Sequence, residues 1–127
     1  EIFEKGTYFV AVHEKEDVVA CAGITPKTSS DGESASEWIL CAVTVHPDFR
    51  CRGLGSHLIN MAISEARKKT VFGAETLELV TLKEKMASAC RLYERLDFKV
   101  VKTEKVRDHP MPMTVLWYNL DLRVSDN

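Results

Sequence analysis

One short segment, VHPDFRCRGLGSHLI at residues 45–59, constrains the fold of this chain more than any other. It follows the apolar run EWILCAVTV and leads into a stretch whose apolar residues recur at helical spacing. The glycines Gly53 and Gly55 therefore mark the exit from a strand and the first turn of a helix. The apolar face of that helix is predicted to consist of Leu58, Ile59, Ala62, Ile63 and Ala66.

A strand-to-helix junction of this kind is suited to binding an anion. The first N–H groups of a helix have no intrahelical acceptors, and the helix dipole adds positive character there. Glycines allow a ligand to approach the backbone, and Arg50 and Arg52 add charge that can pair with phosphate oxygens. The same spacing also suits a plain turn with solvent-facing arginines, so both interpretations stay open. The segment is not a Walker loop, and GLGSHL lacks the third glycine of G-x-G-x-x-G.

The remaining pattern predicts one α/β domain over residues 1–127, with a mixed α+β sheet. Hydrophobic residues make up 45% of the chain and charged residues 28%, which is typical of a globular protein. Strands are predicted at 7–14, 17–26, 37–45, 76–82, 98–106 and 114–122, and helices at 53–69 and 86–96. The order β-β-β-α-β-α-β-β favours two parallel strands at the centre and antiparallel strands at the flanks. We interpret the apolar residues at both parities of 37–45 as a strand covered on both faces.

Charge and cysteine usage exclude several other classes of function. A net charge of -2 gives no general nucleic-acid footprint, and no apolar run is long enough to cross a bilayer. The four cysteines stand singly, without C-x-x-C or histidines at ligand spacing, so we expect free thiols and no metal site. We expect a cytoplasmic location, with the nucleus as the alternative.

Two motifs resemble those of the GNAT N-acetyltransferase superfamily. Arg50, Gly53 and Gly55 satisfy R-x-x-G-x-G, which is similar to the pyrophosphate-binding motif of that family. Downstream, ACRLYERLDFKVV is similar to the family's A-x-x-L-Y-E-x-x-G-F-x-x-x. Together the two motifs cover roughly residues 36 to 106 in the expected order.

The resemblance implies a fold and a cosubstrate. In the family, two central parallel strands splay apart and acetyl-CoA lies between them, with its pyrophosphate on the motif's backbone amides. Here the splayed strands would be 37–45 and 76–82. The residues implied to bind acetyl-CoA are Val43, Thr44, Val45, Arg50, Cys51, Arg52, Gly53, Leu54, Gly55 and Ser56.

This sequence departs from the family pattern at three places. Met86 stands where many members have an asparagine that contacts the pantetheine arm. Asp97 stands where the family has glycine, so it must adopt or avoid a left-handed conformation. We also expect the family's first strand and two helices, which shape much of the acceptor site, to have no counterpart before Glu1.

The resemblance also implies catalytic residues. Tyr93 matches the family position that commonly protonates the departing thiolate, and packing on a buried helix face is the competing role. Glu37 begins EWILCAV, which resembles the strand that carries the catalytic glutamate in histone-acetyltransferase members. The alternative is that Glu37 is only an exposed glutamate at the strand end. His46 and His109 are the other candidate bases, and a water molecule could relay the proton. Met111 and Met113 are expected to pack in the last loop or to line an acceptor pocket.

The predicted function is transfer of acetyl from acetyl-CoA to a primary amine of a small molecule, protein or peptide. The alternative is a non-catalytic GNAT-fold module that binds acetyl-CoA or CoA as a sensor. Tyr93 and the intact R-x-x-G-x-G favour the enzyme, whereas Met86 favours the sensor.

Overall fold

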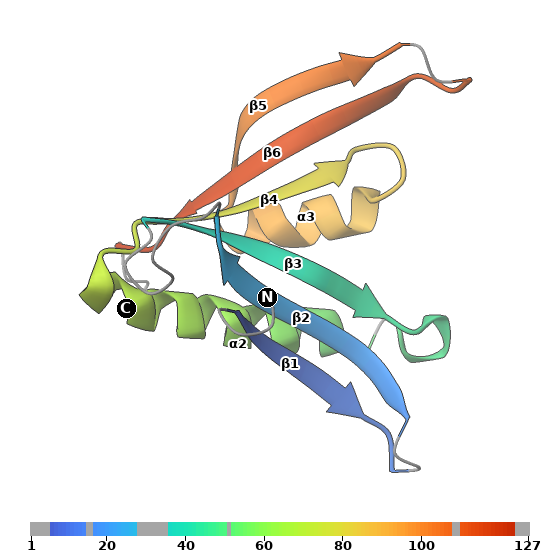
Figure 1. Cartoon of the computed structure of the whole chain (residues 1–127). Helices are drawn as coiled ribbons and strands as arrows, with labels where there is room; N and C mark the ends of the chain where they lie inside the picture. Colours follow the sequence, from blue (N-terminus) through green and yellow to red (C-terminus); the bar gives the residue numbers. More distant parts are fainter. Residues whose placement is uncertain (1–5, 15–16, 28–35, 51, 108–109, 124–127) are drawn as a thin grey trace.

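The computed structural model describes residues 6–14, 17–27, 36–50, 52–107 and 110–123. These residues form a six-stranded mixed sheet with the strand order β1-β2-β3-β4-β6-β5 (Figure 1). The strands are β1 (Thr7–Val12), β2 (Val18–Pro26), β3 (Glu37–Val45), β4 (Thr76–Leu82), β5 (Lys99–Val106) and β6 (Met113–Asp121). Two α-helices, α2 (Leu54–Lys68) and α3 (Ala87–Arg95), interrupt them in the predicted order, so the predicted mixed sheet is confirmed.

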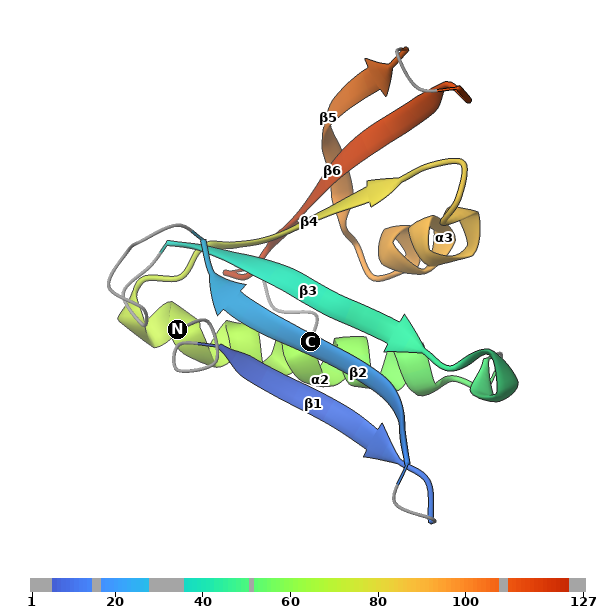
Figure 2. The ribbon, with the colours of Figure 1, turned by 45° about the vertical axis from the view of Figure 1, so that its right-hand side comes forward.

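The sheet consists of two antiparallel halves that are joined at one parallel pair of strands. Strands β1, β2 and β3 form one half, and β4, β6 and β5 form the other. The parallel pairing of β3 with β4 covers only three residue pairs and ends at Ile39 opposite Glu78. Beyond that pair the two halves diverge, as Figures 1 and 2 show. The splay that the family resemblance implied is therefore present.

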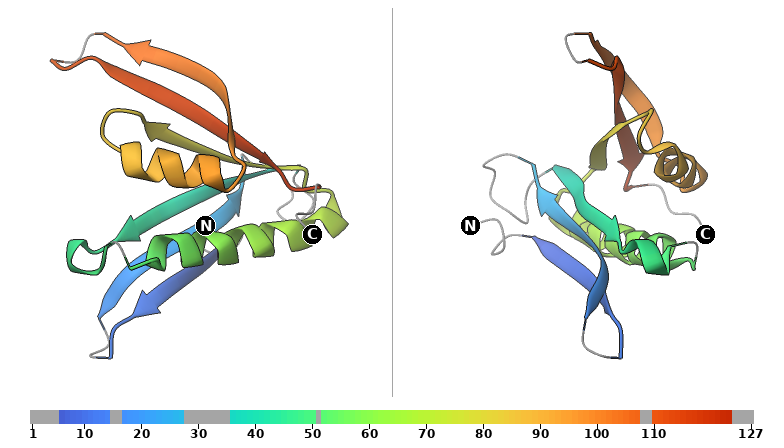
Figure 3. Two further views of the ribbon diagram at one scale, coloured as in Figure 1. Left: turned by 180° about the vertical axis from the view of Figure 1, so that it is seen from behind. Right: turned by 90° about the vertical axis from the view of Figure 1, so that its right-hand side faces the viewer.

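Both described α-helices lie on one face of this sheet (Figure 3). Helix α2 buries the five apolar residues predicted from its periodicity, and Leu58 packs with Ala20 and Ala22 of β2. Helix α3 buries Cys90 and Tyr93 in the larger core cluster. The largest fully buried side chains of that core are Trp38, Tyr118 and Phe98. The opposite face of the sheet carries no helix among the described residues.

A β-bulge changes the face that β3 presents to the helices. Gly23 of β2 pairs with Cys41, but Cys21 pairs with Thr44, so the register between the two strands shifts there. Ala42 lies at this point with a φ of 56°. Trp38 and Leu40 face the core before the bulge, whereas Val43 and Val45 pack against core residues after it. The apolar residues at both parities thus reflect a change of face at the bulge, and among the described residues the helices cover one of the two faces.

Asp97 ends α3 in the left-handed conformation that the family's glycine would take without strain. Its φ is 75°, and its N–H donates to the carbonyl oxygen of Glu94 at 3.2 Å. The N–H of Phe98 then donates to the carbonyl oxygen of Tyr93 at 3.0 Å. This geometry turns the chain so that Phe98 enters the core, where it is 2% exposed.

Candidate functional site

The candidate site begins where β3 and β4 part. After the last parallel pair, the remaining residues of β3 run beside no hydrogen-bonded partner on the β4 side. Val43, Thr44 and Val45, which the family resemblance implies as ligand-binding residues, lie at this free end of β3. Because backbone N–H and C=O groups seek partners, a ligand that can both donate and accept hydrogen bonds suits this strand end.

The N-terminus of α2 lies close behind this strand end. Gly53 is its N-cap residue with a φ of 81°, and no side chain of the described residues caps the helix. No acidic residue occupies the first turn, which Leu54, Gly55 and Ser56 begin. Gly55 also lies close to β3, because a Cβ atom added to it would lie 3.5 Å from Cγ2 of Val45. The structure thus brings the predicted strand end and the predicted glycine loop together.

This helix start is suited to binding an anion. Its first N–H groups are oriented along the helix axis, where the dipole favours negative charge. Apart from Gly53 and its two chain neighbours, no atom of the described residues lies within 4 Å of the position that a Cβ of Gly53 would take, so these residues leave room above the loop. An elongated anion can therefore meet backbone donors without displacing a side chain at that point.

The two arginines of the loop have partners within the protein. Nε of Arg50 donates to the carbonyl oxygen of Val45 at 3.1 Å, and the guanidinium of Arg52 lies over the Phe49 ring, 5.2 Å from its centroid. Arg50 thereby connects the loop to the end of β3, a role that the sequence did not indicate. It also lines a hollow of about 280 Å³ at the β2–β3 edge, together with Thr44 and Val45. Cys51 lies outside the described residues.

Tyr93 is buried between aromatic neighbours. It is 5% exposed, and its ring centroid lies 5.8 Å from that of Phe98 and 5.9 Å from that of Tyr118. Burial raises the pKa of the Tyr93 phenol above its usual value, and the nearby Cys90 thiol adds to the shift. The phenol therefore keeps its proton throughout the neutral pH range, as a proton donor must.

Glu37 lies at the closed end of the splayed pair, opposite Thr76. Its side chain is 54% exposed, and its Oε1 lies 3.7 Å from Nζ of Lys27. Nζ of Lys27 also donates to Oε1 of Glu78 at 2.8 Å. Sequence reasoning missed both Lys27 and Glu78. Glu78 was detectable, because it is the single charged residue within TLELVTL, a strand flanked on both sides by others.

The other candidate bases are placed differently. His46 caps the short 3-10 helix η2 (Pro47–Phe49) by accepting a hydrogen bond at Nδ1 from the Asp48 N–H at 3.1 Å. Its ring also contacts Phe49 edge-on, with the centroids 5.9 Å apart. Capping of this kind is typical of a histidine in a loop. His109 lies outside the described residues.

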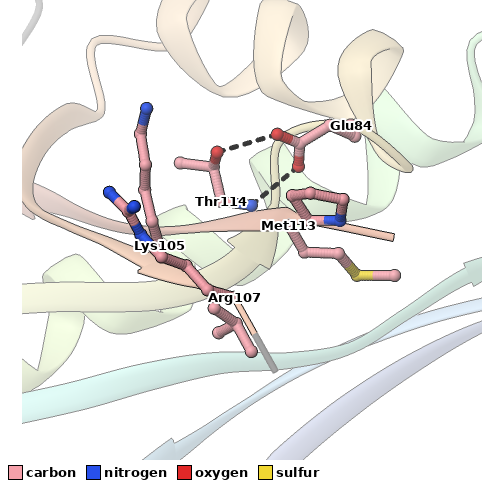
Figure 4. Close-up of a pocket in the computed structure, with 7 residues that line it drawn as sticks. Glu84, Lys105, Arg107, Met113 and Thr114 are labelled. Atoms are coloured by element: carbon pink, nitrogen blue, oxygen red, sulfur yellow. Dashed lines mark hydrogen bonds between the residues drawn. The ribbon is translucent and has the colours of Figure 1, made fainter. Parts of the chain in front are cut away.

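A second hollow, of about 430 Å³, lies between the loop after β4 and the β5–β6 hairpin (Figure 4). Glu84, Lys105, Arg107 and Met113 are among the residues that line it, and Glu84 and Met113 lie on the side away from Lys105 and Arg107. The Glu84 carboxylate accepts hydrogen bonds from the N–H of Thr114 at 2.8 Å and from its hydroxyl at 2.7 Å. These bonds lower the pKa of the Glu84 carboxyl below its usual value. Met113 lines this hollow, whereas Met111 is 66% exposed.

The part of the chain that the structure describes holds no group of three histidine, cysteine, aspartate or glutamate residues arranged to bind a metal ion. None of its helices is both long enough and apolar enough to cross a membrane.

Known structures share this fold at low sequence identity. YncA from Salmonella typhimurium, solved with its cofactor acetyl-CoA, matches 94% of this chain at 24% identity with a TM-score of 0.74. The ribosomal-protein-S18-alanine N-acetyltransferase from Escherichia coli matches 96% at 23% identity with a TM-score of 0.74. Arabidopsis thaliana NAA60, in complex with a bisubstrate analogue, matches 92% at 15% identity with a TM-score of 0.72.

The matched proteins are longer than this chain, which spans 66%, 72% and 75% of their respective lengths. Among curated proteins, no sequence matches it. The family model described as "Acetyltransferase (GNAT) family" matches residues 1–98, most of the chain. Since that match includes the splayed strands, the glycine loop and Tyr93, the chain belongs to the GNAT acetyltransferase family.

Proposed function

We propose that this protein transfers the acetyl group of acetyl-CoA to a primary amine. The observation that carries the proposal is the divergence of β3 from β4 directly in front of the glycine-opened N-terminus of α2. This arrangement offers a free strand end to the pantetheine arm and backbone donors to the pyrophosphate. Family membership and the shared fold of YncA, which was solved with acetyl-CoA, support the choice of cosubstrate.

The residues that would hold acetyl-CoA form two groups. Val43, Thr44 and Val45 would meet the pantetheine and acetyl groups along β3. The segment from Arg50 to Ser56 would hold the pyrophosphate, chiefly through backbone N–H groups at the start of α2. The hydrogen bond of Arg50 to Val45 supports a role for this arginine in holding the two groups in register.

The reaction needs a neutral amine, a stabilised oxyanion and a proton for the leaving thiolate. The amine nitrogen forms a bond to the carbonyl carbon, the carbon–sulfur bond breaks, and the nitrogen loses a proton while the sulfur gains one. Tyr93 would supply the proton to sulfur, since burial keeps its phenol protonated. Glu37 would accept the proton from nitrogen, directly or through water.

A sensor that binds acetyl-CoA without turnover is the second candidate. Met86, the N-cap residue of α3, favours it because methionine replaces the asparagine that the family pattern leads one to expect. The methionine is 43% exposed and donates no side-chain hydrogen bond.

Two measurements on the full chain test the proposal. Acetyl-CoA should raise the Tm by mass action, and a panel of amines and lysine-containing peptides should be screened for CoA release. Turnover on any amine excludes the sensor. A thermal shift without turnover on the whole panel favours the sensor, and no thermal shift contradicts both functions.

A further inference from the structure

The face of the sheet that no described helix covers carries an ion-pair group at the end of the sheet where β3 and β4 are still paired. Nζ of Lys27 contacts Oε1 of Glu78 at 2.8 Å and lies 3.7 Å from Oε1 of Glu37. The side chains differ in exposure, at 16% for Glu78 against 54% for Glu37. The ammonium is thus held by the more buried carboxylate, where water screens the interaction least.

Glu78 lies at the point where the sheet divides. It is opposite Ile39 in the last parallel pair, and Asn119 is its partner on β6. The next positions on the same face of the diverging strands, Cys41 and Val80, are about 7 Å further along, at two residues of strand rise. The ammonium of Lys27 is therefore held where the two strands begin to diverge.

A partly buried carboxylate in a central strand is unfavourable unless it has a partner. Lys27 supplies that partner in the free protein, so a group that displaces Lys27 from Glu78 must itself carry a positive charge. Oδ1 of Asn119, beside it in the register, is a buried acceptor without a hydrogen-bond partner among the described residues. Together Glu78 and Asn119 offer more acceptors than the one contact with Lys27 uses.

We propose that the ammonium group of the acceptor binds to Glu78 in place of Lys27, and that the acceptors are unbranched primary alkylamines. The inference rests on the proposed acetyltransferase function and names the substrate class of that site. The lysine side chain is itself a primary ammonium on an unbranched four-carbon stem, so an alkylammonium of the same kind can make the same contact with Glu78. Lys27 occupies the place of the substrate in the free protein and competes with it.

The first test compares KM and kcat for n-butylamine at saturating acetyl-CoA. Glu78→Gln should raise KM at least tenfold with a smaller change in kcat, because the amide cannot pair with the ammonium. Lys27→Met should lower KM several-fold by removing the competitor. Lys27→Arg should raise it, because a guanidinium pairs with a carboxylate in bidentate geometry. The wild type should use n-butylamine at least tenfold better than aniline, which is uncharged at neutral pH.

A matched ion pair on α2 supplies the controls. Nζ of Lys68 lies 3.6 Å from Oε1 of Glu65 on the helix surface, so Lys68→Met and Glu65→Gln should leave KM unchanged. A KM that is unchanged or raised in Lys27→Met would show that Lys27 only neutralises Glu78 and would overturn the inference. Since Lys27→Met leaves a carboxylate unpaired, its Tm is measured alongside, and the opposite effect of Lys27→Arg remains decisive if Lys27→Met does not fold.

The second test does not require turnover. Limiting acetic anhydride labels lysines, and mass spectrometry gives the ratio of labelled Lys27 to labelled Lys68 within the same molecules. n-Butylammonium chloride should raise this ratio at least threefold by displacing Lys27 from Glu78, and tetramethylammonium chloride at equal ionic strength should not. An unchanged ratio overturns the inference even where acetyl-CoA shifts the Tm. Absence of that shift contradicts the proposed function instead, so the two failures are distinguishable.

Discussion

Nε of Arg50 donates a hydrogen bond to the carbonyl oxygen of Val45, with the two atoms 3.1 Å apart. The contact joins the loop before α2 to the free end of β3. The sequence pattern suggested that this arginine pairs with phosphate, whereas its observed partner is a backbone carbonyl. Arg50 can act by connecting the two segments or by pairing with phosphate. The two roles predict different effects of salt on the loss of acetyl-CoA affinity when Arg50 is replaced.

We expect Arg50→Ala to weaken acetyl-CoA binding by about tenfold, the effect of about one hydrogen bond that positions the loop. Because this loss arises from positioning, it should persist between low and high salt in calorimetric titrations. A loss that shrinks steeply as salt rises would assign Arg50 to direct phosphate pairing instead. Lys68→Ala, which removes an exposed positive charge paired with Glu65 in the last turn of α2, is the control.

Substitutions at Gly55 can distinguish effects on the stability of the fold from effects on the binding of acetyl-CoA. A Cβ at Gly55 would make an ordinary contact of 3.5 Å with Val45, so Gly55→Ala should stabilise the free chain by up to about 1 kcal/mol through helix propensity. Gly55→Leu should keep the fold but abolish the Tm shift caused by acetyl-CoA, because its side chain occupies the approach to the backbone. A full shift in Gly55→Leu would contradict the pyrophosphate assignment.

The sequence predicted most of the fold because the deciding signals are local. Helix α2 follows from its periodicity and its glycine start, and each strand follows from an apolar or β-branched run. The bulge at Ala42 could not be predicted, since a positive φ at alanine is set by the pairing of β2 with β3 and not by the residue. The conformation of Asp97 could not be predicted either, because it depends on tertiary packing. In the structure Asp97 is left-handed, and Phe98 after it is buried in the core.

The candidate site was only partly predictable. The glycine loop and Tyr93 belong to contiguous motifs, so reading them required no tertiary information. The contact between Lys27 and Glu78 joins residues 51 positions apart and depends on the register of three strands. No local sequence pattern predicts such a contact, although the lone glutamate within TLELVTL indicates that Glu78 is unusual.

Glu37→Gln tests the assignment of the base. If Glu37 accepts the proton of the amine, this change should reduce turnover most at low pH, where nearly all of the amine is protonated. The loss should shrink as the pH approaches the pKa of the amine. A pH–rate profile of unchanged shape would remove Glu37 from the mechanism and favour His46 or a water relay.

Glu84 should report its hydrogen bonds to Thr114 in an NMR titration. The backbone N–H and the hydroxyl of Thr114 lower the pKa of this carboxyl, so the contribution of the contact to stability is present above the usual glutamate pKa. It is lost as the pH falls through the lowered value. The amide shift of Thr114 should therefore titrate with a midpoint below 4.5. In Thr114→Val the midpoint should move upward, and an unchanged midpoint would contradict the assignment.

Tyr93→Phe is the most direct test of the proposed chemistry, because it keeps the ring against Phe98 and Tyr118 and deletes only the hydroxyl. If Tyr93 protonates the thiolate, kcat should fall by about 10² to 10⁴ while acetyl-CoA affinity stays nearly unchanged. Tyr93→Ala should in addition lower the free energy of unfolding by about 3–5 kcal/mol, since it opens a cavity in the core. A Phe variant with near-normal kcat, measured where chemistry limits the rate, would restrict Tyr93 to packing. The thiolate would then take its proton from solvent.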